Sequence, residues 1–216
     1  MNEVEFSDRL RAAGPRAEEL SAETLEKLVT YWNLLARWNA VINLTALPLD
    51  PPSDAALQRL LIEPMEASRN FPKAAKMWFD LGSGGGSPAI PLKLLHPHVP
   101  LVLVEVRSRK AAFLREAVRT LLLSDVEVLS SPFEKVALER PGVADVITAR
   151  AVKHDAAFAA TVRALLGPMG CLLSFQTGSK PLEIQGLTNV ASWEIAAAGP
   201  TLLATYVPRG TRNVDR

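Results

Sequence analysis

The sequence contains a single cysteine, and this absence of a partner excludes several kinds of site. Cys171 cannot form an internal disulfide or contribute to a cysteine-based zinc site. It stands in the apolar run GCLLSF, so we predict a small buried residue in a strand. The three histidines, at positions 96, 98 and 154, do not follow a metal-binding or catalytic spacing. We therefore expect no metal site.

Long hydrophobic runs and an excess of either charge are also missing. No apolar run approaches the roughly 20 residues that span a bilayer, and the charged start MNEVEFSDRLR does not resemble a signal peptide. We therefore expect a cytoplasmic protein with no membrane contact, and a monomer. The net charge of +1 means that any nucleic-acid contact would depend on local clusters of cations. With 216 residues, 48% of them hydrophobic, the chain can bury a sizeable core.

The most informative stretch is KMWFDLGSGGGSP, residues 76–88, where an apolar run ends in an acid and a cluster of glycines. Glycines at 82, 84 and 86 allow a sharp turn with positive φ and let backbone amides approach a ligand. Pro88 and the apolar run after it predict a helix start, with Ser87 as its cap. The stretch therefore predicts a strand, a glycine loop and a helix N-terminus.

Dinucleotides and S-adenosylmethionine both bind to such a loop, and two features favour the second. The spacing is GxGxG, and the third glycine of a dinucleotide fingerprint would fall at Ser87. Asp80 would repel a pyrophosphate but attract an ammonium or sulfonium group, by on the order of 4 kcal/mol at an effective dielectric of about 20. A dinucleotide or a purely structural glycine turn remains the alternative.

Residues after three later strands are further candidates, because ligands of open α/β sheets bind beyond the carboxyl ends of the strands. Glu105 ends the run LVLVE, where a carboxylate can accept hydrogen bonds from ribose hydroxyls. Phe133 could cover an adenine ring and Glu134 could receive its amine, although Pro132 with an acid after it also suits a helix start. Arg150 is predicted to contact ligand or substrate, with an ion pair as the alternative.

The pattern of apolar residues changes along the chain and predicts a helical extension at residues 1–70 and an α/β domain at residues 71–216. Helices are predicted at 4–13, from Ser21 to about 45, and at 54–70. Trp32 and Trp38 on the second of these could pack in the core or stack on bases. After residue 76 the pattern predicts a mostly parallel seven-stranded sheet with crossover helices. The expected strands are 76–81, 100–106, 125–130, 144–149, 170–176, 192–197 and 201–207, and the expected helices are 88–96, 108–122 and 154–166.

Four segments in this order, WNAVINLTA, DLGSGGGSPAIPL, LVLVEVRSRKAAFL and ITARAV, resemble the RsmG family, also called glucose-inhibited division protein B. The resemblance covers about residues 28–178. It implies a Rossmann-like class I methyltransferase fold and transfer of a methyl group from S-adenosylmethionine to the 7-nitrogen of a guanine in small-subunit ribosomal RNA. The partner would then be that RNA or the small ribosomal subunit. The predicted cofactor-binding residues are Asp80, Gly82, Ser83, Gly84, Gly86, Ser87, Glu105, Pro132, Phe133, Glu134 and Arg150.

The chain departs from the family pattern on the substrate side. A His-x-x-Asp-Ser segment is replaced by RLLIE at residues 59–63, an arginine by Ser131, and a Lys-Gly by QTG at residues 176–178. The glycine loop also reads Gly-Ser-Pro-Ala, at residues 86–89, where the family has Gly-Phe-Pro-Gly. A diverged homologue with another substrate or no activity is therefore the second hypothesis. A dinucleotide-dependent oxidoreductase is the third, and Asp80 disfavours it.

A guanine 7-nitrogen carries a lone pair and no proton, so its methylation needs no general base, and none is expected. Alignment of the reacting groups and electrostatic stabilisation of the cationic product would supply the catalysis. Arg150 is the candidate substrate contact. Cations after the second predicted strand could bind phosphates, or could form an ordinary solvated helix face; they are Arg107, Arg109, Lys110, Arg115 and Arg119.

Overall fold

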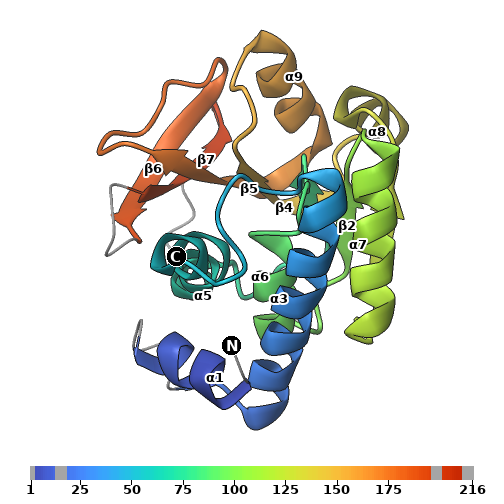
Figure 1. The fold of residues 1–216 in the computed structure, drawn as a ribbon. Coiled ribbons are helices and arrows are strands. Elements are labelled where there is room, and N and C mark those ends of the chain that lie inside the picture. The colour runs from blue at the N-terminus through green and yellow to red at the C-terminus, as the bar shows by residue number, and fades with distance from the viewer. Residues whose placement is uncertain (1–2, 13–18, 196–200, 211–216) are drawn as a thin grey trace.

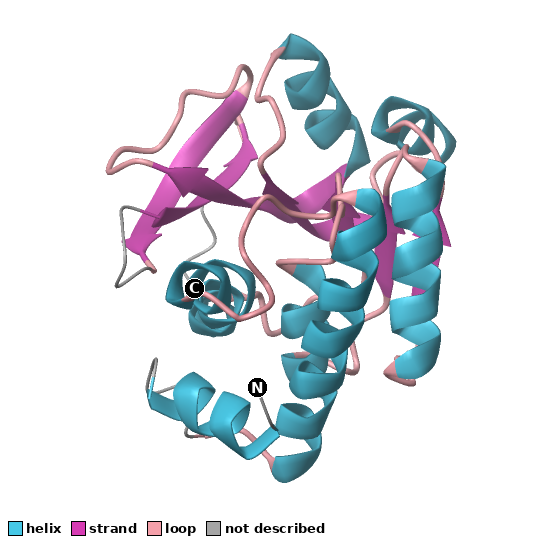
Figure 2. Cartoon of the chain, viewed as in Figure 1, coloured by secondary structure: helices cyan, strands magenta, loops and turns pink. Residues whose placement is uncertain are grey.

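The computed structural model describes residues 3–12, 19–195 and 201–210, which fold around a seven-stranded sheet (Figures 1 and 2). The strand order is β3-β2-β1-β4-β5-β7-β6. The first five strands are parallel, and β7 lies antiparallel between β5 and β6. The strands are β1 (Trp78–Leu81), β2 (Leu101–Val104), β3 (Val126–Leu129), β4 (Ala144–Arg150), β5 (Leu166–Thr177), β6 (Leu187–Glu194) and β7 (Thr201–Pro208).

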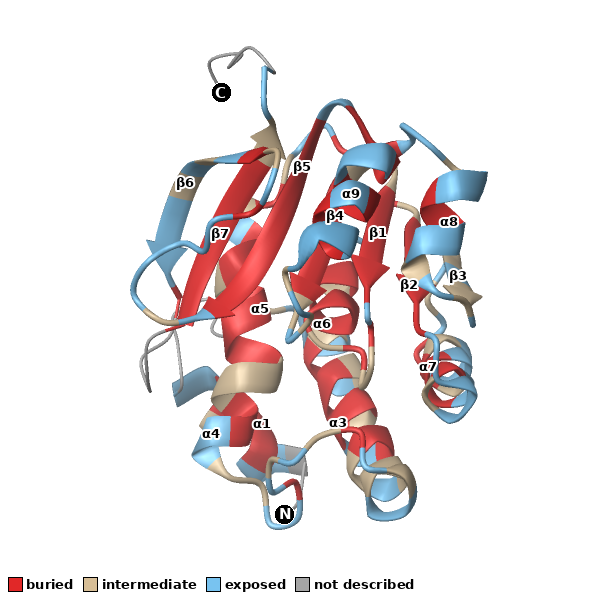
Figure 3. Ribbon diagram, turned by 90° about the horizontal axis from the view of Figure 1, so that it is seen from above, coloured by how far each residue is buried: buried red, intermediate tan, exposed pale blue. Residues whose placement is uncertain are grey.

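Four crossover helices connect the parallel strands and cover both faces of the sheet. They are α6 (Ala89–Leu95), α7 (Ser108–Thr120), α8 (Phe133–Glu139) and α9 (Ala156–Leu165). Helices α6 and α7 share a hydrophobic cluster with one face, and α8 and α9 share a second cluster with the other. Strands β1 and β2 are buried at every position, because both of their faces are covered (Figure 3). This explains why β2 is an unbroken apolar run and β1 is apolar except for Asp80.

The N-terminal segments form a helical arm on the face covered by α6 and α7. Helix α1 (Glu3–Ala12) and the long helix α3 (Ala22–Ile42) are followed by a helical run in four pieces. These pieces are α4 (Asp54–Leu57), the π-helical turn η1 (Gln58–Ile62), α5 (Glu63–Ala67) and the 3₁₀ turn η2 (Ser68–Asn70). The arm shares one hydrophobic cluster with the sheet and with α6 and α7. It therefore packs directly against the rest of the fold.

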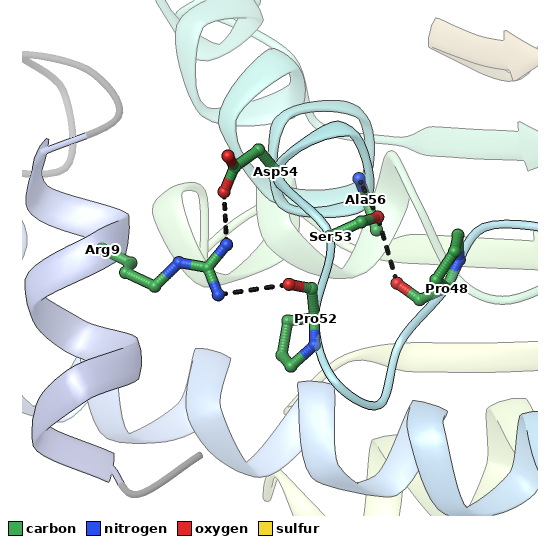
Figure 4. Close-up of polar contacts among 6 residues, drawn as sticks. All are labelled: Arg9, Pro48, Pro52, Ser53, Asp54 and Ala56. Carbon is green, nitrogen blue, oxygen red and sulfur yellow. Dashed lines mark hydrogen bonds and ion pairs between the residues drawn. The ribbon is translucent and has the colours of Figure 1, made fainter.

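Polar contacts tie α1 to the start of α4 (Figure 4). The Arg9 guanidinium forms an ion pair with Asp54 and donates to the carbonyl oxygen of Pro52 at 3.1 Å. Ser53 caps α4 by accepting from the amide of Ala56 at 3.2 Å, and its hydroxyl donates to the Pro48 carbonyl. These contacts fix the connector between α3 and α4.

Several predictions about the arm and the core are confirmed. Ser21 caps α3 by accepting from the Thr24 amide. Trp32 is buried and its ring lies 5.5 Å from that of Phe6, whereas Trp38 packs edge-on against Phe113 at 5.9 Å between centroids. Trp32 therefore lies in the core, and Trp38 is partly buried and packs against it. Cys171 is fully buried in β5, as the apolar run around it predicted.

Other predictions were wrong at particular elements. Ser87 does not cap α6, because Pro88 occupies the cap position and no side chain bonds there. Strand β6 spans 187–194 and not 192–197, of which 196–197 lie outside the described residues. Strand β5 begins at residue 166, directly after α9, and a bulge opposite β4 accommodates its first residues. Helix α8 was absent from the expected elements, but the alternative of a helix start at Pro132 is confirmed.

Candidate functional site

The glycine loop leaves the carboxyl end of β1 as a tight turn. Gly82, Gly84 and Gly86 have φ angles of 76°, 52° and 87°, in the left-handed region that favours glycine. The amides of Gly82 and Ser83 both donate to the carbonyl oxygen of Val104, at 2.9 and 3.1 Å. The sharp turn with positive φ that the glycines predicted is confirmed, and the turn is anchored to the end of β2.

The arm packs on this loop through α3. The Tyr31 hydroxyl donates to the carbonyl oxygen of Gly85 at 2.6 Å. A Cβ at Gly85 would lie 3.2 Å from a methyl group of Leu35, and a Cβ at Gly86 would lie 2.5 Å from Ile90. Burial raises the pKa of Tyr31 far above its usual range, so its hydroxyl remains a neutral donor. Two of the glycines therefore make room for the protein's own helices.

Asp80 lies beneath the loop and is only 1% exposed. Its carboxylate accepts from the Thr148 hydroxyl at 2.5 Å, and that hydroxyl accepts in turn from the Trp78 indole at 2.8 Å. The Ser83 hydroxyl donates to the backbone carbonyl of Asp80 and is buried there. Burial raises the pKa of Asp80 to about 6, although the bond from Thr148 opposes the rise. At neutral pH the site therefore holds a largely unsolvated negative charge.

Glu105 follows β2 and connects it to the glycine loop. One carboxylate oxygen accepts from the amide of Gly84 at 2.9 Å, and the other accepts from the amide of Arg107 at 2.8 Å. The side chain is buried and its orientation is fixed by both bonds. Because each carboxylate oxygen can accept more than one hydrogen bond, both oxygens retain capacity for hydroxyl donors.

Arg150 ends β4 on the same face as Asp80 and is held by the arm. Its guanidinium donates to the Glu63 carboxylate at 2.9 Å and to the carbonyl oxygen of Arg59, and it lies 4.4 Å from the centroid of the Phe175 ring. Burial lowers its pKa to about 10, so it stays charged at neutral pH. The ion pair that the sequence left as an alternative is present, with Glu63 as its acid.

The π-helical turn explains why the arm can dock here. Pro64 has no N–H, so the carbonyl of Leu60 has no helical donor four residues on. The amide of Glu63 bonds to Gln58, which leaves the Arg59 carbonyl free as well. The hydroxyl of Ser87 donates to the carbonyl oxygen of Leu60 at 2.8 Å, and the guanidinium of Arg150 donates to the carbonyl oxygen of Arg59. The turn therefore joins the arm to both the glycine loop and the end of β4, as π turns at functional sites often do.

The residues after β3 reach the same edge of the sheet, with β2 between them and the strand that leads into the glycine loop. The carbonyl of Leu129 accepts from the amide of Glu105 at 3.0 Å, so the ends of β2 and β3 adjoin. Pro132 begins α8, Phe133 lies half-buried and edge-on to Phe158, and Glu134 is exposed in the first turn. The predicted contacts of these three with an adenine ring stay predictions.

Comparisons with known proteins decide which family this is. A family model described as rRNA small subunit methyltransferase G matches residues 24–198. The chain belongs to this family. A ribosomal RNA small subunit methyltransferase G of Xanthomonas euvesicatoria is 35% identical over 205 residues, covering 93% of this chain and 92% of that protein. One from Polynucleobacter asymbioticus is 32% identical over 183 residues, covering 84% and 82%.

The fold has counterparts among solved structures. A SAM-dependent methyltransferase from Aquifex aeolicus superimposes with a TM-score of 0.58 at 17% identity, covering 71% of this chain and 93% of that one. The predicted Rossmann-like methyltransferase fold and the resemblance to the small subunit methyltransferase G family are both confirmed. The oxidoreductase hypothesis has no support from the family.

Two of the departures from the family pattern are built into contacts of this chain. Glu63 forms the buried ion pair with Arg150. Gln176 is also buried, donates to Tyr206 and Ser174, and accepts from the amide of Leu182 at 2.9 Å. These residues therefore have structural partners here.

Sequence reasoning missed the supporting side chains Tyr31, Glu63 and Thr148, and also Thr201, whose hydroxyl donates to Glu63 at 2.8 Å. One available signal was the acid of Glu63 inside the apolar run LLIEPM, because an acid in a buried stripe needs a partner. A second was Thr148, two residues before Arg150 and therefore on its face of the strand.

The structure adds two findings about what is absent. Among residues 3–12, 19–195 and 201–210, no three His, Cys, Asp or Glu side chains gather closely enough to hold a metal ion. Within the part of the chain that the structure describes, no helix is long and apolar enough to cross a membrane.

Proposed function

We propose that this protein transfers a methyl group from S-adenosylmethionine to the 7-nitrogen of a guanine in small-subunit ribosomal RNA. The observation that carries the proposal is the left-handed glycine turn between two buried acids, Asp80 and Glu105, in a chain of the small subunit methyltransferase G family. The family supports the reaction and the RNA substrate. The residues of the site support the cofactor.

The chemistry of the donor and acceptor groups suits this cofactor. S-adenosylmethionine carries an ammonium and a sulfonium group, which an unsolvated carboxylate such as Asp80 stabilises. Its ribose offers two hydroxyl donors, and Glu105 is an oriented carboxylate with acceptor capacity. The turn at Gly82 and Gly84 gives backbone amides a close approach. We assign the amino-acid part of the cofactor to Asp80 and Arg150 and the ribose to Glu105.

The bound cofactor would supply an activated methyl group on a positively charged sulfur. The protein's own residues then have to align the reacting atoms and exclude water, which can contribute roughly 7 to 11 kcal/mol. Asp80 would keep its negative charge close to the developing purine cation above its pKa of about 6. No side chain needs to accept a proton, because the guanine 7-nitrogen has none to lose.

The substrate side rests on cations near the carboxyl edge of the sheet. Arg107 and Arg109 are exposed where α7 begins, and Lys153 is exposed after β4. We propose that these side chains contact RNA phosphates. Affinity should then fall with salt, with a log–log slope of roughly −0.7 per phosphate contacted on single-stranded segments. The rival, a diverged homologue with another substrate or none, is favoured by the altered residues at 59–63, 131 and 176–178.

The test is methyl incorporation into small ribosomal subunits that lack the modification, with calorimetry of S-adenosylhomocysteine binding. Asp80→Asn and Glu105→Gln should each weaken binding at least tenfold. Asp145→Asn is the matched control, because Asp145 caps the amides of Lys76 and Met77 at the opposite end of the strands. Tight cofactor binding with salt-insensitive RNA affinity and no incorporation would favour the rival hypothesis.

The expected monomeric state and cytoplasmic location stay predictions. Size-exclusion chromatography with light scattering would test the first.

A further inference from the structure

The Arg150–Glu63 pair is buried to a degree that stability alone does not explain. The two side chains are 7% and 4% exposed. Removing two charges from water costs several kcal/mol per ion, and such a pair is often no more stabilising than apolar residues of similar volume. Because the pair lies beside the glycine loop, we look for its role in the binding of a ligand at that loop.

Both oxygens of Glu63 are held by elements far apart in the sequence. One accepts from the Arg150 guanidinium at 2.9 Å, and the other accepts from the Thr201 hydroxyl at 2.8 Å. Glu63 stands at the start of α5, and Thr201 is the first residue of β7. The carboxylate is thus fixed between the arm and the sheet, and it has no freedom to follow Arg150 elsewhere.

The Arg150 guanidinium is also fixed, but one of its three nitrogens has no hydrogen-bond partner. The two terminal nitrogens donate to Glu63 and to the carbonyl of Arg59, and one face of the guanidinium covers Phe175. The Nε–H is buried and has no hydrogen-bond partner. Asp80 lies close enough for its charge to act on the guanidinium. An oriented cation next to the acid under the glycine loop suits an anionic or carbonyl acceptor of a ligand.

We propose that Glu63 is a positioning residue. It holds the Arg150 guanidinium at the carboxyl end of β4, beside Asp80, and Thr201 holds Glu63 in place. The inference rests on the proposed function, since it assumes that the cofactor's amino-acid part lies beside Asp80 and Arg150. Glu63 acts through Arg150 and does not itself touch the ligand.

A double-mutant cycle separates this role from a direct one. The variants are Glu63→Gln, Arg150→Gln and the double variant, and the measurement is the dissociation constant for S-adenosylhomocysteine by calorimetry. Each single change should weaken binding about tenfold. The double variant should bind as weakly as Arg150→Gln alone, because Glu63 has no effect without its arginine. An additive loss of about a hundredfold would overturn the proposal.

A matched control separates positioning from a general loss of stability. Lys93 is 1% exposed and its ammonium donates to the carbonyls of Pro97 and Val99, at the far end of α6. Lys93→Met should lower the melting temperature and leave the dissociation constant unchanged. If Glu63→Gln behaves in the same way, with a lower melting temperature and unchanged affinity, Glu63 is only structural and the proposal is wrong.

The failure of this inference and that of the proposed function give different results. If the unmodified chain does not bind S-adenosylhomocysteine, both fail. If it binds, and Asp80→Asn weakens binding while Arg150→Gln does not, the cofactor site stands and the positioning role is overturned.

A milder variant keeps the test available if Glu63→Gln does not fold. Thr201→Val removes the hydroxyl that holds Glu63. It should weaken binding about threefold, and the same change in an Arg150→Gln background should have no further effect. A threefold loss in both backgrounds would contradict the proposal.

Discussion

Two arginine–glutamate pairs lie at opposite ends of the parallel strands, and they differ in how far water can reach them. Near the amino ends of the strands, Arg140 donates both terminal nitrogens to Glu127 at 2.6 and 2.8 Å, with side chains 36% and 46% exposed. At the carboxyl ends, Arg150 and Glu63 meet at 2.9 Å with almost no exposure. The exposed pair has the better geometry, yet water can hydrate either side chain if the pair is broken. Water cannot reach the buried pair, so breaking it leaves an unsolvated charge.

The largest effect should come from breaking the buried pair. Arg150→Gln leaves Glu63 charged and unpaired and should lower the free energy of unfolding by about 3 to 5 kcal/mol, whereas Arg140→Gln should lower it by less than about 1 kcal/mol. Urea denaturation measures both. Burial already raises the pKa of Glu63, so loss of Arg150 should matter more at pH 8 than at pH 5, where the acid can neutralise. Equal losses of unfolding free energy for the two arginine variants would show that burial does not distinguish the two pairs.

The second effect has the opposite sign. The folded chain holds Asp80 at a pKa of about 6 against an ordinary 3.8, so the folded state binds the proton more tightly than the unfolded state. Stability is therefore lost as pH rises from about 4 to 6, by about 3 kcal/mol. Asp80→Asn should raise the free energy of unfolding by up to that amount at pH 8 and by little at pH 4, while weakening cofactor binding. No gain in stability at pH 8 would mean that the carboxylate is better solvated than the structure indicates.

The smallest of the three effects concerns the carbonyl that Pro64 leaves free. Ser87→Ala removes its donor and should lower the free energy of unfolding by about 1 kcal/mol. The loss should shrink in a Pro64→Ala background, because residue 64 then supplies an amide to Leu60. Ser131→Ala, at a hydroxyl near the surface, is the control. The measurement is thermal and urea unfolding of the unmodified chain, the two single variants and the double variant. If Ser87 acts elsewhere, the losses in unfolding free energy from the two changes will be additive.

The elements that the sequence predicted well are those with both faces buried. Strand β2 is an unbroken apolar run and β1 is apolar except for Asp80, so their positions were correct to within two residues at each end. Strand β6 is the last strand in the sheet order, beside β7, and is exposed along much of its length, so its apolar residues form no clear pattern. The register of such an edge strand depends on its neighbour, which local sequence does not reveal.

The site divides in the same way. The glycine loop and Glu105 were predictable because their constraints act within a few residues: positive φ at glycines, and an acid at a strand end. The partner of Arg150 was not, because Glu63 lies 87 residues earlier and the ion pair depends on how the arm docks. Ser87 was assigned to a local cap for the same reason, although it bonds to Leu60, 27 residues away. Long-range pairing of polar groups is what the local pattern could not supply.

The bond between Thr201 and Glu63 also joins two segments that are synthesised far apart in time. The two residues are 138 positions apart, and β7 lies between β5 and β6 in the sheet although it follows both in the chain. The arm leaves the ribosome early, but its buried carboxylate gains its second partner only when the β7 segment has emerged and folded. Until then a nascent chain that already contains the whole glycine loop would lack a locked Arg150. Competence to methylate would therefore be acquired late, as a property of the finished chain.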